Sequence, residues 1–99
     1  MEVSFHKHKL TRFCSINKIN RLALFGSALR GELKPDSDID LLVEFKQGHV
    51  PGYFNLSRME TELAQMFGGR KIDLRTPAEL SKYFREEVIS AAEVLYSES

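Results

Sequence analysis

Apolar and acidic residues alternate between positions 38 and 45 of this chain. Such alternation predicts a β-strand with one face buried in the core. The buried face is expected to comprise Ile39, Leu41, Val43 and Phe45. Asp38 and Asp40 begin the opposite face and therefore project together.

Other apolar patterns predict the remaining elements. Short apolar runs indicate strands at 21–25, 71–75 and 93–96. Helical spacing predicts three helices, marked by Leu10, Phe13 and Cys14, by Leu56, Met59, Leu63, Met66 and Phe67 before Gly68-Gly69, and by Leu80, Phe84, Val88 and Ala91 or Ala92. Residues 17–20 are expected to turn the chain. Alternating strands and helices predict one α/β domain over residues 1–99, a small mixed β-sheet with helices packed against it.

The acidic face of the 38–45 strand carries candidate metal chemistry. The α-carbons of Asp38 and Asp40 are expected to lie about 7 Å apart, so that their carboxylates could bracket one or two cations. Two neighbouring carboxylates need a compensating charge, and magnesium bound to ATP would supply it. Glu44 lies about 20 Å from Asp38 along an extended strand, which excludes it as a ligand of the same ion. The alternative is a turn or a solvated strand edge.

A third candidate carboxylate belongs to Asp73, at the centre of the 71–75 strand. Ile72 and Leu74 are expected to face the core, which places Asp73 on the other face with Arg75. A neighbouring strand would direct Asp73 toward the same metals. The alternative is a surface aspartate paired with Lys71 or Arg75.

A glycine-serine turn follows the 21–25 strand directly. Gly26 would let the backbone approach a phosphate, and Ser27 would offer a hydroxyl and an amide at the start of a short helix that ends at Gly31. Arg30 could reach the same anion, and Ser37, in the turn before the acidic strand, is a further candidate nucleotide contact. The alternative is a simple helix N-cap.

Composition limits the classes of function. The 99 residues include 14 basic and 14 acidic side chains, and this balance argues against a nonspecific grip on nucleic acid. The single cysteine, Cys14, excludes an internal disulfide, agrees with a reducing compartment and is expected to fill the core. No apolar run approaches the length of a membrane span, so we expect a cytoplasmic protein that does not contact membranes.

The order Gly-Ser-x-x-Arg-Gly, Ser-Asp-Ile-Asp-Leu and a distal aspartate resembles the signature of the minimal nucleotidyltransferases. These are the smallest members of the DNA polymerase beta-like nucleotidyltransferase superfamily. The resemblance extends over nearly the whole chain. It implies that Asp38, Asp40 and Asp73 form the catalytic metal-binding triad and that Gly26 and Ser27 contact the triphosphate. Leu29 departs from the small residue that is usual before the arginine.

The resemblance also implies a partner and a reaction. Such proteins are commonly encoded beside a HEPN-type partner, a suspected ribonuclease, with which they act as antitoxin and toxin in a hetero-oligomer. The implied reaction moves AMP from ATP onto a partner tyrosine hydroxyl with two Mg²⁺ ions.

Two other functions remain open. One is an antitoxin that inhibits its partner by covering it, without catalysis. The other is transfer to RNA or to a small molecule, against which the neutral charge and the lack of an acceptor-binding domain argue.

Overall fold

The computed structural model describes residues 7–26 and 38–98, which form a four-stranded sheet and the helices packed around it. The helices are α1 (Lys7–Ile16), α2 (Tyr53–Met66), the short 3-10 helix η2 (Pro77–Glu79) and α3 (Arg85–Ala91). The strands are β1 (Ile19–Phe25), β2 (Ile39–Phe45), β3 (Ile72–Arg75) and β4 (Glu93–Ser97). The predicted α/β class with a mixed sheet is confirmed.

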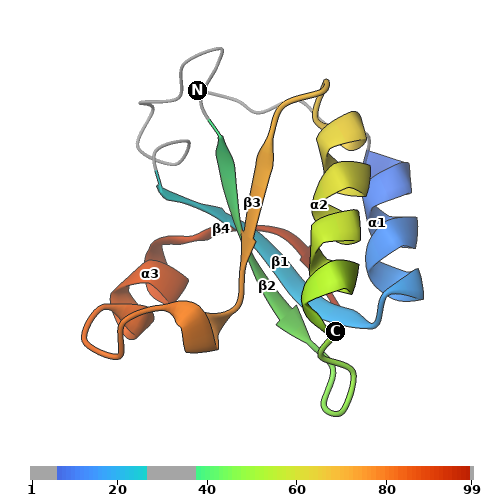
Figure 1. Cartoon of the computed structure of the whole chain (residues 1–99). Helices are drawn as coiled ribbons and strands as arrows, with labels where there is room; N and C mark the ends of the chain where they lie inside the picture. Colours follow the sequence, from blue (N-terminus) through green and yellow to red (C-terminus); the bar gives the residue numbers. More distant parts are fainter. Residues whose placement is uncertain (1–6, 27–37, 99) are drawn as a thin grey trace.

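The sheet has the strand order β3-β2-β1-β4. β1 runs antiparallel to both β2 and β4, whereas β2 and β3 are parallel. α1 and α2 lie side by side against the sheet (Figure 1). β3 and β4 are therefore the edge strands, and β1 and β2 are central.

The core lies between the sheet and the α1–α2 layer. On β2, Ile39, Leu41 and Val43 are fully buried, as the alternation predicts. Met59 and Leu63 of α2 pack into the same cluster, together with Ile72 and Leu74 of β3. Two buried faces thus fix β2 and β3 in one orientation, which turns their aspartates to the opposite face.

The turn after α1 is shorter than the sequence predicts. The turn after α1 occupies only residues 17 and 18, because Lys18 takes a left-handed conformation (φ 58°) and reverses the chain at once. Ile19 is then already buried in β1.

The last helix is shorter than predicted. It begins at Arg85 rather than near Leu80, whose backbone is extended (φ −80°, ψ 148°) after η2. Phe84 is 60% exposed, and α3 buries none of its residues. The helical spacing of Leu80, Phe84 and Val88 therefore predicted a longer helix than the structure contains, and these residues do not form a buried face.

Cys14 gives the core a titratable group. It is completely buried, as expected for a core residue, and burial raises the pKa of its thiol from 9.0 to about 12. The folded chain therefore keeps this proton at pH values where the unfolded chain loses it. The stability that the folded chain gains from keeping this thiol neutral is complete below pH 9 and is lost as the pH rises toward 12.

We expect the free energy of unfolding of the wild type to fall more steeply above pH 9 than that of Cys14→Ala. The difference in slope should reach at most about 1.4 kcal/mol per pH unit, because one proton is involved. Urea denaturation of both proteins at intervals between pH 8 and 11 measures it. Parallel stability curves would show that Cys14 does not titrate with unfolding.

Candidate active site

Two aspartates lie side by side on neighbouring strands. In the parallel pair of β2 and β3, Asp40 is in register with Asp73. Adjacent strands are about 4.8 Å apart, so the two carboxylates start from neighbouring points on one face of the sheet. Asp38 directly precedes β2. The described fold thus brings all three predicted aspartates to the same ends of two adjacent strands.

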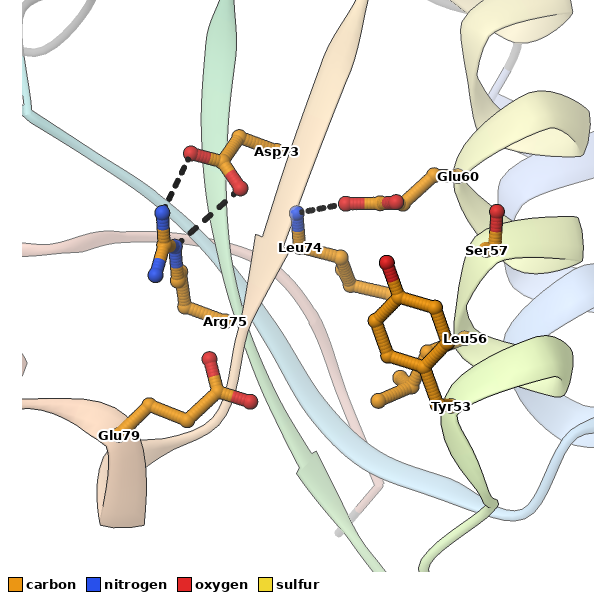
Figure 2. A pocket seen from close by; sticks show the side chains of 8 residues that line it. All are labelled: Tyr53, Leu56, Ser57, Glu60, Asp73, Leu74, Arg75 and Glu79. Atoms are coloured by element: carbon orange, nitrogen blue, oxygen red, sulfur yellow. Dashed lines mark hydrogen bonds and ion pairs between the residues drawn. The ribbon is translucent and has the colours of Figure 1, made fainter.

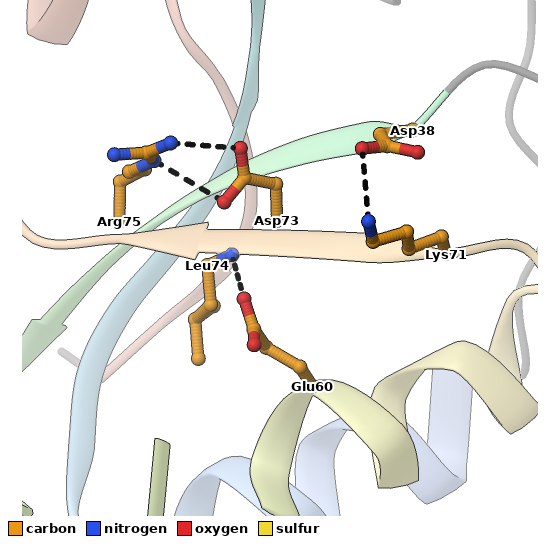
Figure 3. Close-up of polar contacts among 6 residues, drawn as sticks. All are labelled: Asp38, Glu60, Lys71, Asp73, Leu74 and Arg75. Atoms are coloured by element: carbon orange, nitrogen blue, oxygen red, sulfur yellow. Dashed lines mark hydrogen bonds and ion pairs between the residues drawn. The ribbon is translucent and has the colours of Figure 1, made fainter. Parts of the chain in front are cut away.

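Two basic residues, one directly before β3 and one at its end, accompany these aspartates. The Lys71 ammonium lies 3.9 Å from a carboxylate oxygen of Asp38. The Arg75 guanidinium donates two hydrogen bonds to the carboxylate of Asp73, at 3.2 and 3.1 Å (Figure 3). The hydrogen bond and the charge of Asp73 raise the pKa of Arg75 above its usual range. Of the two pairings named as the surface alternative for Asp73, the one with Arg75 occurs, whereas Lys71 pairs with Asp38.

The donor chemistry of the aspartates fits a hard divalent cation. Carboxylate oxygens are the protein ligands that Mg²⁺ prefers. Across residues 7–26 and 38–98, however, no three His, Cys, Asp or Glu side chains are arranged as a ready metal-ligand group. Asp38 and Asp73 are directed toward Lys71 and Arg75 instead (Figure 3). Half-exposed ion pairs of this kind contribute only about 0–1 kcal/mol, so both carboxylates can turn toward a cation at little cost.

Gly26 closes the end of β1 against Asp40. Phe25, the last residue of β1, is in register with Asp40, and Gly26 follows with φ 76°. A β-carbon at Gly26 would lie 2.5 Å from the Oδ2 atom of Asp40. The absence of a side chain therefore leaves room for the Asp40 carboxylate. This contact could not be predicted from the sequence, because it depends on the register between two strands.

A cleft of about 300 Å³ lies beside Asp73, between α2 and β3 (Figure 2). Its polar lining comes from Tyr53, Ser57 and Glu60 of α2, Asp73 and Arg75 of β3, and Glu79 of η2. The Glu60 carboxylate accepts a hydrogen bond from the Leu74 backbone N–H at 2.8 Å. This bond fixes one wall of the cleft to the other.

Comparison with known proteins identifies the family. The model of the nucleotidyltransferase domain family matches residues 7–95. The chain belongs to this nucleotidyltransferase family. The protein adenylyltransferase MntA of Thermococcus cleftensis is 33% identical over 91 residues, which are 92% of this chain and 84% of that protein.

Solved structures share the nucleotidyltransferase fold. A toxin–antitoxin complex with AMP-PNP aligns with a TM-score of 0.72 and 21% identity, covering 95% of this chain and 75% of that one. A chain in the structure of a tri-AMPylated HEPN toxin of Shewanella oneidensis in complex with an MNT antitoxin aligns with a TM-score of 0.64 and 19% identity. That alignment covers 93% of this chain and 70% of the other.

Not all predicted site residues of this nucleotidyltransferase can be placed. Ser27, Arg30 and Ser37 lie outside the described residues, as does the short helix expected after Gly26. Glu44, which the sequence excluded as a ligand, forms an ion pair with Arg21 of β1 at 3.5 Å.

Four cleft residues were not predicted from the sequence: Tyr53, Ser57, Glu60 and Glu79. The first three share one face of α2 by helical spacing, but only the docking of α2 beside β3 gives that face a cleft to line.

Proposed function

We propose that this nucleotidyltransferase moves AMP from ATP onto the hydroxyl group of a tyrosine side chain in a HEPN-type toxin. By this modification it acts as the antitoxin of that toxin. The observation that supports this most is the arrangement around Asp40. Asp40 is in register with Asp73 on the neighbouring strand. Its carboxylate occupies the space that a side chain at Gly26 would fill. A carboxylate pair beside a glycine turn is what a metal-assisted transfer from a nucleoside triphosphate requires.

The relatives support the choice of AMP and of a protein acceptor. The Thermococcus cleftensis relative is named a protein adenylyltransferase, and the Shewanella oneidensis toxin in complex with its antitoxin carries AMP groups. We extend both properties to this chain as part of the proposal. Its single cysteine is a buried, free thiol, which suits a reducing cytoplasm.

The residues divide the chemistry among them. Asp38 and Asp40 would hold the two Mg²⁺ ions, and Asp73 would share the ion on the acceptor side. Bound magnesium would neutralise phosphate charge and lower the pKa of the acceptor hydroxyl. Gly26 and Ser27, with Arg30 and Ser37 as further predicted contacts, would orient the triphosphate.

The bonds change in one displacement step. The acceptor oxygen forms a bond to the α-phosphorus as its proton passes toward Asp73. The bond from the α-phosphorus to the bridging oxygen breaks, and pyrophosphate leaves with the electron pair. The products are an AMP ester of the acceptor and pyrophosphate.

Position-specific labelling of ATP tests the type of transfer. With a co-expressed toxin as acceptor, we expect label from the α-phosphate to enter the protein and label from the γ-phosphate to leave in pyrophosphate. Transfer of the γ-label would indicate a kinase reaction and contradict the proposal.

A steric antitoxin is the second candidate, and one observation favours it. Tyr53 and Phe54 at the start of α2 are 82% and 87% exposed and contact each other edge to face. Neighbouring exposed aromatic rings are typical of a protein interface. Inhibition by contact alone would survive the loss of the aspartates, whereas the proposed catalysis would not.

A further inference from the structure

We propose that the cleft between α2 and β3 is the acceptor subsite, and that it takes a polypeptide segment whose hydroxyl residue is flanked by a basic side chain. The inference rests on the proposed AMP transfer and adds the location and the charge of the acceptor. Three features of the described residues support it: the order of the strands, the charge of the cleft and the hydrogen bond that occupies a backbone N–H at the edge of β3.

The strand order separates the two substrates. Gly26 follows β1, Asp40 lies on β2, Asp73 lies on β3, and β1, β2 and β3 are consecutive in the sheet. The cleft borders β3, the strand of these three that is farthest from β1, and Asp73 is part of its lining. A triphosphate held at the Gly26 turn would therefore reach the aspartates from one side. The cleft gives a second molecule access to Asp73 from the other.

The charge of the cleft excludes the triphosphate and favours a cation. Glu60, Asp73 and Glu79 contribute three carboxylates, and Arg75 contributes the single guanidinium. The carboxylates therefore outnumber the guanidinium by two, whether or not Arg75 keeps its hydrogen bonds to Asp73. Glu79 is exposed at the rim, where it can attract a positive side chain. A tetra-anionic nucleotide would be repelled from this space, whereas a lysine or arginine beside the accepting hydroxyl would complement it.

The edge of β3 favours recognition through side chains. An edge strand normally offers unpaired N–H groups to an added strand. Here the Leu74 N–H is bonded to the Glu60 carboxylate, which obstructs strand addition at the middle of β3 (Figure 2). The exposed Tyr53 ring lines the cleft and supplies an apolar contact for the incoming segment. At about 300 Å³ the cleft is at the small end of ligand pockets and suits one or two side chains.

Short peptides provide the probe. We would compare a tyrosine flanked by arginines, a tyrosine flanked by glutamates, and the arginine peptide with phenylalanine in place of tyrosine. Fluorescence anisotropy measures binding without chemistry, and mass spectrometry with Mg²⁺ and ATP measures transfer. We expect the wild type to bind both arginine peptides at least about five-fold tighter than the glutamate peptide and to modify only the peptide with tyrosine.

Charge variants locate the effect. Glu79→Lys should abolish the preference for arginine, and Glu79→Gln should reduce it. Glu62→Lys is the matched control, since Glu62 is an exposed glutamate of α2 that does not line the cleft, and it should leave the preference unchanged. Equal binding of the arginine and glutamate peptides, or a preference that Glu79→Lys does not alter, would overturn the inference.

The two readouts separate this inference from the proposed function. A charge preference that depends on Glu79, with no transfer to peptide or toxin, would contradict AMP transfer and support the cleft as a site for basic segments. Transfer that is indifferent to Glu79 and to the flanking charges would support the proposed function and overturn the subsite.

Discussion

Asp40→Asn is expected to lower the rate of AMP transfer by a factor of about 10³ or more. Asparagine has nearly the shape of aspartate but no negative charge, so it would bind a divalent cation poorly beside Asp73. The fold should persist, because the neighbouring Ile39 and Leu41 provide the buried contacts of β2. Incorporation of α-phosphate label into the toxin measures the effect.

Glu44→Gln provides the matched control for Asp40→Asn. Glu44 lies on the same strand and the same face, but it pairs with Arg21 at 3.5 Å and is no candidate ligand. We expect its variant to keep wild-type transfer within about two-fold, since this partly buried pair lies away from the aspartates and a single ion pair contributes little. Asp40→Asn retaining more than a tenth of the wild-type rate would contradict the role assigned to Asp40.

Gly26→Ala is expected to impair both stability and transfer. The new β-carbon would lie 2.5 Å from the Asp40 Oδ2 atom and 3.3 Å from its Cβ, so the carboxylate must move. The backbone there also has φ 76°, which costs a residue with a side chain about 1–2 kcal/mol. We expect at least about a hundred-fold loss of transfer, because a displaced metal ligand no longer meets its ions.

Gly48→Ala separates these two effects. Gly48 has φ 81°, and a β-carbon there would meet no atom within 4 Å. This variant should show a similar loss of stability, about 1–2 kcal/mol by denaturation, with transfer unchanged. If Gly26→Ala and Gly48→Ala were equally active, the packing of Gly26 against Asp40 would not matter for catalysis.

The sequence predicted the central strands because their signals are local. The alternation in β2 was sufficient to bury Ile39, Leu41 and Val43 and to turn Asp40 away from the core. Asp73 was predicted on a strand face in the same way. Its register with Asp40 was not predictable, because a parallel pairing is set by the α2 crossover and by the shared core rather than by either strand alone.

The parts of the site that escaped prediction depend on contacts between distant segments. Gly26 was interpreted as a phosphate contact, whereas the described structure also packs it against Asp40, fourteen positions later. The cleft forms where α2 docks beside β3, and Glu79 joins it through η2. The predicted start of α3 was wrong because a helical spacing of apolar residues was not accompanied by burial in the fold. Leu80 and Phe84 have helical spacing, but Leu80 has an extended backbone, Phe84 is 60% exposed and α3 buries none of its residues.

Within residues 7–26 and 38–98, no helix is long and apolar enough to span a membrane. The reaction we propose needs a protein partner that brings its hydroxyl to Asp73. Catalysis and simple binding make different predictions for that partner, since only catalysis leaves a covalent mark on it.

The intact mass of the toxin is the most direct measurement. The toxin would be incubated with Mg²⁺, ATP and either the wild-type nucleotidyltransferase or Asp40→Asn, and weighed by mass spectrometry. Our account predicts an increase by one or more AMP units with the wild type and no increase with the variant, although both bind the toxin. An unmodified toxin that both proteins inhibit equally would contradict it and establish inhibition by contact alone.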